Sequence, residues 1–121
     1  MYTRILVGTD GSKTAALAVD KAAEVAAASG ASLTILSVGP KAGAVVQAEQ
    51  ARVVGTGVDV KTLALSGDPA SVLIDTAASG AYDLLVVGNK GMTGASRFFL
   101  GSVPNKISHH APCALLIVRT T

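Results

Sequence analysis

The stretch DLLVVGNKG, residues 83–91, decides the fold class of this chain. Its apolar run from Leu84 to Val87 has no polar alternation, which is typical of a strand buried on both faces of a sheet. Gly88 closes the run and Gly91 follows three residues later, as expected where a strand turns into a loop. We therefore expect this stretch to be the most buried strand of a parallel sheet.

Similar apolar runs lie on either side of it, at residues 4–9, 32–38, 59–65 and 113–119. The segments between the runs favour helices, most clearly where alanine and valine recur at helical spacing from Ala15 to Ala27. This alternation predicts an α/β domain with a five-stranded parallel sheet and helices on both faces. Two strand orders fit, 3-2-1-4-5 and 2-1-3-4-5, and both place a ligand beyond the carboxyl ends of the strands.

Capping residues mark the expected helix ends. Ser12 follows the first strand and suits the start of a helix, while Gly30 suits the end of that helix. Asp68 stands directly before Pro69, the usual order at the first turn of a helix. Residues 42–54, by contrast, have only weak helical character.

Composition and charge limit the class of protein. The 121 residues suit a single domain, residues 1–121, and the one cysteine excludes an internal disulfide framework. Without a secretion signal or an apolar run of membrane-spanning length, we expect a cytoplasmic protein with no membrane contact. The net charge of +2 is too small to indicate nucleic acid. Residues 84–121, however, carry four lysine or arginine residues and no carboxylate, which favours a small anion nearby.

The strongest chemical signal is a glycine-rich element that predicts a phosphate site. Gly88, Gly91 and Gly101 let the backbone approach an anion closely, and Ser102 stands where a helix begins. A helix amino terminus adds unpaired N–H donors and the positive end of its dipole. Lys90 and Arg97 add positive charge between the glycines.

Asp10, directly after the first strand, is the second candidate. A carboxylate there could bind a ribose hydroxyl, an adenine amine, or a Mg²⁺ ion that bridges phosphates. No cluster of protein ligands for a metal accompanies it, since His109 and His110 are adjacent and face different sides of a helix. We therefore expect any metal ion to arrive with the phosphates.

Other nucleotide motifs fail on their spacing. Residues 8–14, GTDGSKT, lack the adjacent glycine and lysine that a P-loop requires, because Ser12 separates them. No G-x-G-x-x-G follows a strand, which argues against a nicotinamide cofactor. A phosphoacceptor receiver domain would need clustered acids after the first strand, and Asp10 stands alone.

Three elements together resemble the universal stress protein family: ILVGTDGS at residues 5–12, GDP at residues 67–69, and the pattern G-x2-G-x9-G-S from Gly88 to Ser102. The similarity runs over nearly the whole chain, and the glycine spacing is that of the family's ATP-binding subgroup. The resemblance implies the strand order 3-2-1-4-5 of the adenine nucleotide alpha hydrolase-like fold. It also implies a homodimer and ATP bound between the first and fourth strands.

Site residues follow from the same resemblance. Thr9 and Asp10 would contact the base and the ribose, and the backbone of Val38 would bind the adenine. The phosphates, with Mg²⁺ or Mn²⁺, would be held by Gly88, Lys90, Gly91, Gly101, Ser102 and Val103. Residues 39–57 are fewer than most members have between the second and third strands, which implies a short or badly formed second helix. AMP and cyclic AMP therefore stay open as ligands beside ATP.

These features favour a nucleotide-binding stress-response or regulatory protein with little or no turnover, because the phosphate loop offers no acid or glutamine to orient water. A slow ATPase, a protein that phosphorylates itself at Ser102 or Thr93, and a scaffold with a vacant site are the alternatives. In the order 3-2-1-4-5, the apolar strand from Ala114 to Arg119 is an edge. Pairing with the same strand of a second copy would cover it.

Overall fold

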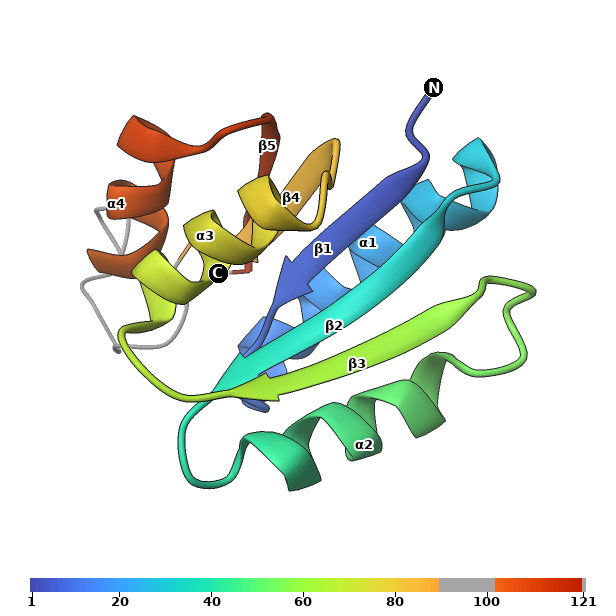
Figure 1. The fold of residues 1–121 in the computed structure, drawn as a ribbon. Coiled ribbons are helices and arrows are strands. Elements are labelled where there is room, and N and C mark those ends of the chain that lie inside the picture. The colour runs from blue at the N-terminus through green and yellow to red at the C-terminus, as the bar shows by residue number, and fades with distance from the viewer. Residues whose placement is uncertain (90–101, 121) are drawn as a thin grey trace.

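The computed structural model describes residues 1–89 and 102–120, in which strands and helices alternate (Figure 1). The strands are β1 (Arg4–Gly8), β2 (Ser32–Val38), β3 (Val60–Leu65), β4 (Leu84–Gly88) and β5 (Ala114–Val118). The helices of the described residues are α1 (Lys13–Ser29), α2 (Ala42–Val53), α3 (Pro69–Ser79) and α4 (Ser102–His110). Each strand predicted from the sequence is confirmed to within one residue at either end.

The five strands form one parallel sheet in the order β3-β2-β1-β4-β5. Of the two orders that fit the sequence, 3-2-1-4-5 is therefore the correct one. β1 lies in the centre, paired with β2 on one side and with β4 on the other. The chain winds outward from β1 in one direction through β2 and β3, and in the other through β4 and β5. The carboxyl ends of β1 and β4 thus flank the point where the winding reverses.

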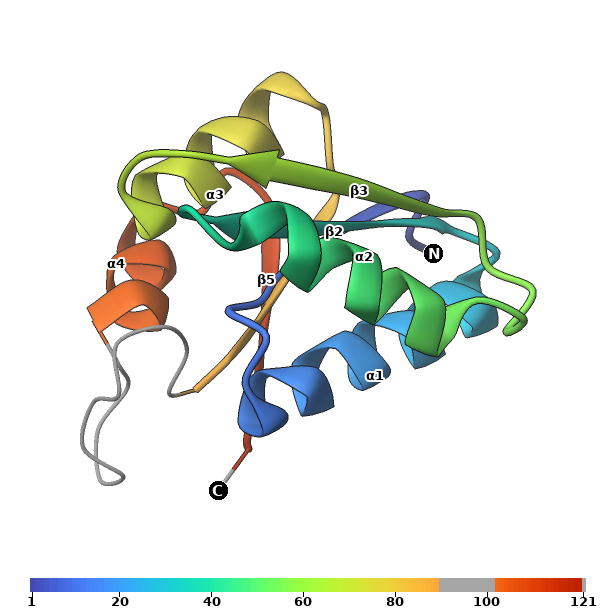
Figure 2. The same cartoon turned by 90° about the horizontal axis from the view of Figure 1, so that it is seen from below.

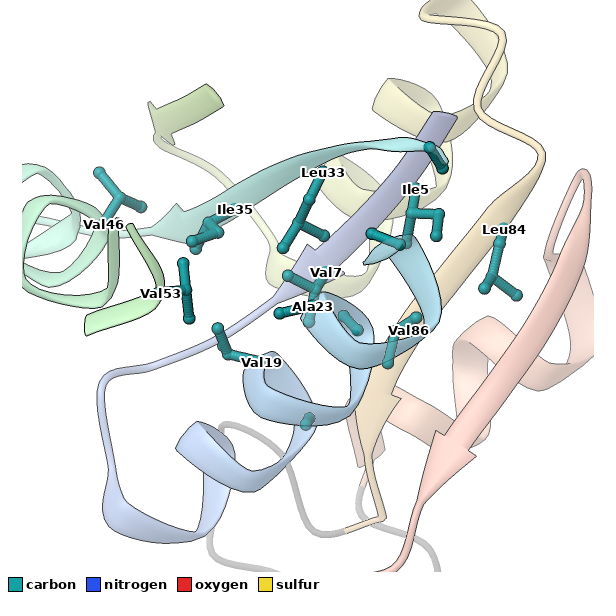
Figure 3. Close-up of a cluster of buried hydrophobic side chains, with 14 residues drawn as sticks. Ile5, Val7, Val19, Ala23, Leu33, Ile35, Val46, Val53, Leu84 and Val86 are labelled. Atoms are coloured by element: carbon teal, nitrogen blue, oxygen red, sulfur yellow. The ribbon is translucent and has the colours of Figure 1, made fainter. Parts of the chain in front are cut away.

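Helices cover both faces of the sheet, α1 and α2 on one face and α3 and α4 on the other (Figures 1 and 2). Successive residues of β1 alternate between the two cores: Ile5 and Val7 pack toward α1 and α2 (Figure 3), and Leu6 packs toward α3 and α4. All three side chains are fully buried. A central strand covered on both faces has no room for polar alternation, which explains the continuous apolar runs.

Local capping explains where α1 begins and ends and where α3 begins. Ser12 Oγ accepts a hydrogen bond from Ala15 N at 3.1 Å, and Gly30 ends α1 in the left-handed conformation at φ 69°. Asp68 caps α3 by accepting from Ser71 N at 3.0 Å, with Pro69 in the first turn. All three predicted caps are confirmed, because each uses chemistry local to its own turn.

The helix α2 is better formed than its sequence indicates. It spans 12 residues and buries Val46 and Val53 against the sheet. Arg52 holds its last turn in place by donating to Glu49 Oε2 and to Asp20 Oδ1 of α1, both at 2.8 Å. Of the expectation of a short or badly formed second helix, the badly formed alternative is wrong, since these tertiary contacts compensate for a weak local pattern. Among the helices described, none is long and apolar enough to cross a membrane.

Candidate functional site

The carboxyl edge of the sheet brings together the ends of β1, β2 and β4. Thr9 and Asp10 follow β1, Val38 ends β2, and Gly88 ends β4. Thr9 N donates to Leu36 O at 3.0 Å, which continues the pairing of β1 with β2 one residue beyond the strand. In Figure 2, β1 leads into the start of α1 near the last described residues of the chain, which follow β5. Residues distant in the sequence therefore share this edge.

A tight turn presents Asp10 to solvent. The Thr9 side chain is buried, 1% exposed, and its Oγ1 accepts a hydrogen bond from Gly11 N at 3.1 Å. Asp10 Oδ1 accepts from Ser12 N at 2.9 Å, while the carboxylate as a whole stays exposed. Thr9 thus stabilises the turn from its buried side, and Asp10 has an exposed carboxylate that can contact a ligand.

A cavity of about 210 Å³ lies beside this turn. Asp10 and Val38 both line it, together with Ser37, Gly39 and Lys41. Asp10, predicted from its place after the first strand, and Val38, implied by the family resemblance, therefore line one cavity. A carboxylate and a half-buried strand end at one cavity can bind a polar, ring-shaped group, since they combine a charged acceptor with backbone donors and acceptors.

The cavity adjoins a larger one of about 510 Å³, which lies between the turn at Gly11 and the exposed side of α2. Lys41 and Val45 line both cavities. Gly11 has φ 82°, and a Cβ added to it would lie 3.0 Å from Val45 Cγ2. The turn therefore packs closely against α2 where Gly11 meets Val45, and the two cavities lie beside this contact.

At the end of β4, Gly88 is buried and paired with Val118 of β5. The next residue, Asn89, extends the pairing, because its backbone N–H donates to Val118 O at 2.9 Å. Its side-chain Oδ1 accepts from Thr120 N at 2.8 Å and from Thr120 Oγ1 at 2.9 Å. The chain therefore leaves β4 in a direction that hydrogen bonds determine.

The start of α4 is fixed by a buried side chain and an ion pair to α3. Val103 is buried in the core that Leu6 and Val87 also form, whereas Ser102 is exposed. Lys106 Nζ lies 3.2 Å from Asp68 Oδ2, which joins α4 to the first turn of α3. Hydrogen bonds from the Ser71 backbone and hydroxyl, then from Lys106, lower the pKa of Asp68 to about 2. Asp68 is therefore ionised across the physiological pH range.

Lys90, Gly91 and Gly101 lie outside the described residues, as do Arg97 and Thr93. The site residues that the structure places are Thr9, Asp10, Val38, Gly88, Ser102 and Val103. In residues 1–89 and 102–120, no three histidine, cysteine or carboxylate side chains gather as a metal site.

Two residues of the site were missed from the sequence. Lys41 sits in a segment of weak pattern, so nothing local indicated that its side chain lines both cavities. Asn89 lies inside the glycine pattern, and an amide directly after a strand is a recognisable signal for side-chain bonding to the backbone. Its partner, Thr120, is 31 residues away and could not be predicted.

A model of the universal stress protein family matches residues 1–47 and 40–119 of this chain. The chain is 33% identical to universal stress protein Rv1636 of Mycobacterium tuberculosis, over 99% of this chain and 98% of that protein. It is 28% identical to universal stress protein YxiE of Bacillus subtilis, over 98% and 100% respectively. The alignment with Rv1636 has 144 positions, whereas this chain has 121 residues, so the relative carries residues that this chain lacks.

Among solved structures, the chain is similar to a universal stress protein in complex with cAMP, with a TM-score of 0.86 and 36% identity. That match covers 99% of this chain and 98% of the other. The two segments matched by the family model overlap at residues 40–47, between the end of β2 and the middle of α2. These residues belong to the segment 39–57 between β2 and β3, which the sequence analysis describes as shorter than in most members.

Proposed function

We propose, because this chain belongs to the universal stress protein family, that it binds an adenine nucleotide, ATP first, at the carboxyl edge of its sheet. The observation that carries this proposal is the meeting of Asp10 and Val38 at one cavity, beside the reversal point between β1 and β4. Ligands of open α/β sheets bind at such points. We propose further that the protein acts in the cytoplasm as a single stress-response domain, residues 1–121.

The base and ribose would occupy the cavity that Asp10 and Val38 line. The backbone of Val38 would pair with the adenine edge, and the exposed carboxylate of Asp10 would accept from a ribose hydroxyl or the adenine amine. Thr9 would act through the turn, since its hydroxyl already accepts from Gly11 N. Lys41, which lines the same cavity, would add a positive charge on the side toward α2.

The phosphates would lie across the end of β4 and the start of α4, bound by Gly88, Lys90, Gly91, Gly101, Ser102 and Val103. The Val103 side chain is buried in the core, so its contribution would be its backbone N–H. Backbone donors at a helix start suit a phosphate because they add to the positive end of the helix dipole. Mg²⁺ or Mn²⁺ would neutralise the phosphates, with Asp10 as the candidate carboxylate beside them.

Calorimetric titration of the purified protein with ATP, AMP and cyclic AMP, with and without Mg²⁺, tests this proposal. We expect one site per chain and the tightest binding for ATP with Mg²⁺. A mass spectrum of natively purified protein would identify a nucleotide that copurifies. If none of the three ligands produces heat or raises the melting temperature, the chain is a partner-binding scaffold and the proposal is wrong.

We also propose that bound ATP turns over slowly or not at all. Efficient hydrolysis needs a group that orients the attacking water, and the candidate residues include no glutamine and no acid besides Asp10. Release of ADP, followed over hours, measures this. A rate above roughly one per minute, still slow for an enzyme, would favour an ATPase, and phosphate retained on Ser102 or Thr93 would favour self-phosphorylation.

A cyclic nucleotide is the second candidate ligand. The similar universal stress protein described in complex with cAMP is 36% identical to this chain. The cavity that the base would occupy has a volume of about 210 Å³. Competition between ATP and cyclic AMP for one site separates the two: cyclic AMP displacing ATP at equal or lower concentration would make it the preferred ligand.

A further inference from the structure

Four polar or charged side chains are buried among the residues that the structure describes: Thr9, Thr34, Ser37 and Glu49. Three of them take part in hydrogen bonds; Thr34 Oγ1, for example, accepts from Tyr82 Oη at 2.9 Å. The Ser37 hydroxyl has no hydrogen-bond partner within residues 1–89 and 102–120, although Ser37 is only 2% exposed. Buried polar groups rarely lack a partner, so we expect one from outside the chain.

The side chain of Ser37 faces the cavity of about 210 Å³ beside the turn after β1. Successive residues of a strand point to opposite faces, and Ile35 of β2 packs in the core beneath α1 and α2. Ser37 lies two residues further along, so it faces the same side, where Val45 of α2 lines the cavity with it. Its hydroxyl is open to this cavity, because the fully enclosed hydroxyl that lacks a partner in the described part of the chain is that of Ser29.

We infer that the Ser37 hydroxyl contacts the base of the bound nucleotide, an inference that rests on the proposed nucleotide binding. The sheet places β4, β1 and β2 side by side. With the phosphates at the end of β4 and the ribose beside Asp10 after β1, a nucleotide that lies across this edge brings its base to β2. A hydroxyl can donate to a ring nitrogen or accept from the adenine amine, so it suits the polar edge of the base.

The hydroxyl of Ser37 should contribute to affinity and not to stability. Water in the cavity can satisfy it in the free protein, and a base that displaces this water must replace the hydrogen bond. Removing the hydroxyl leaves no described group of the protein unpaired, because none bonds to it. Thr34 differs in this respect, since loss of its hydroxyl would leave the buried Tyr82 Oη without its partner.

The test measures nucleotide affinity by calorimetry and stability by urea denaturation in Ser37→Ala. We expect ATP, AMP and adenosine all to bind about fivefold more weakly, the effect of one neutral hydrogen bond, because the three ligands share the base. The 2′-deoxy and 3′-deoxy analogues of adenosine should lose the same factor, since the contact does not involve a ribose hydroxyl. The urea midpoint of the free protein should be unchanged or higher, because the substitution removes a polar group that has no partner.

Two other hydroxyls give matched controls. Thr34→Val should lower the urea midpoint and leave nucleotide affinity unchanged, because it removes the partner of Tyr82 Oη in the core on the opposite face of β2. Ser29→Ala removes a hydroxyl that also lacks a partner, at the end of α1 and away from the cavity, and should leave nucleotide affinity unchanged.

The outcomes separate the inference from the proposed function. Wild-type affinity in Ser37→Ala would remove the role of Ser37 and leave nucleotide binding standing. A lower urea midpoint in Ser37→Ala would mean that the hydroxyl supports the fold, and a loss of affinity that disappears with either deoxy analogue would place it beside the ribose; both results would overturn the inference. A wild type that binds no adenine nucleotide would remove the proposed function, and the contact with it.

Discussion

At the scale of single residues, the site depends on small groups at turns. Gly11 has a positive φ and packs closely against Val45. Asp10 accepts a hydrogen bond from Ser12 N within the turn and keeps its carboxylate exposed. Neither property is visible in residue type alone. Each becomes testable because the chain offers a matched control.

Asp10 is expected to contribute its charge, not only its shape. We predict that Asp10→Ala weakens nucleotide binding by about 1–3 kcal/mol, the range for a hydrogen bond to a charged group. Asp10→Asn keeps an acceptor for Ser12 N, so the turn should survive while the charge is lost. Calorimetry on both variants measures the effect. Wild-type affinity in both would place the ligand away from Asp10.

We predict that Gly11→Ala weakens nucleotide binding, whereas Gly57→Ala, a substitution away from the site, does not. Alanine at a positive φ costs about 1–2 kcal/mol of stability, and the new methyl would lie 3.0 Å from Val45 Cγ2. Gly57 has φ 83° but nothing within 4 Å of an added Cβ, so Gly57→Ala is the control. We expect similar backbone costs by urea denaturation in both variants and weaker nucleotide binding only in Gly11→Ala. Equal affinities would argue against α2 as a wall of the site.

Lys41 should attract the anionic ligand. Removing its charge in Lys41→Ala is expected to reduce ATP affinity about threefold to fivefold, since exposed charge pairs contribute up to about 1 kcal/mol. The effect should shrink as salt is added. Lys61, exposed on β3, is the control. Titrations at two salt concentrations measure both variants, and an equal loss in Lys61→Ala would indicate a general charge effect.

At the scale of elements, hydrogen bonds also join neighbouring strands at their amino-terminal ends, opposite the candidate site. Asp83, just before β4, accepts from Thr3 N and Thr3 Oγ1 at 2.9 Å and from Arg4 N at 3.0 Å. Burial opposes the ionised form, but these hydrogen bonds outweigh it and lower the pKa of Asp83. One carboxylate therefore joins the starts of β1 and β4.

The contribution of Asp83 should depend on pH. Because its folded pKa is lowered, the ionised form stabilises the fold above about pH 4, the ordinary pKa of an aspartate, and the stabilisation is lost as the pH falls through the folded pKa. We expect Asp83→Asn to lower the free energy of unfolding by about 1 kcal/mol at pH 7 and by progressively less in acid. Urea denaturation at several pH values measures this. A constant difference at every pH would contradict the assignment.

At the scale of the whole molecule, the two edges of the sheet differ in chemistry. The exposed edge of β3 carries Lys61 and Thr62, whereas β5 is Ala-Leu-Leu-Ile-Val with no charge. Charged and polar residues on an edge discourage strand pairing, and an uncharged apolar edge invites it. We therefore propose β5, from Ala114 to Arg119, as the interface of a homodimer.

The dimer can be tested without disturbing the β4–β5 pairing. Val118 O accepts from Asn89 N, so Val118 faces β4 and the backbone of Ile117 faces the open edge. Ile117→Pro should remain folded by circular dichroism but be monomeric, because proline is tolerated only where its missing N–H faces outward. Light scattering should report twice 12.0 kDa for the wild type and 12.0 kDa for this variant.

The matched control for the dimer lies on the opposite edge. Leu65 O accepts from Gly39 N, so Leu65 faces β2 and the neighbouring Ala64 faces outward from β3. Ala64→Pro should therefore leave the mass of the dimer unchanged. A wild type that is monomeric at all concentrations would exclude β5 as the interface.

The sequence alone determined the elements, their order and their caps. An apolar run such as residues 84–87, bounded by turn residues, is typical of a strand buried on both faces. Ser12, Gly30 and Asp68 act within their own turns, so their effects are local. The strand order 3-2-1-4-5, which the family resemblance implied and periodicity alone left open, is confirmed by the structure. The regular form of α2 and the bonds from Asn89 to Thr120 came only with the tertiary structure. Each depends on groups far apart in the chain, and a pattern of neighbours carries no information about which distant groups meet. Asp10 was predicted from its place after the first strand and Val38 from the family resemblance, whereas their shared cavity, with Lys41 in its wall, was decided by the packing of α2 against the sheet.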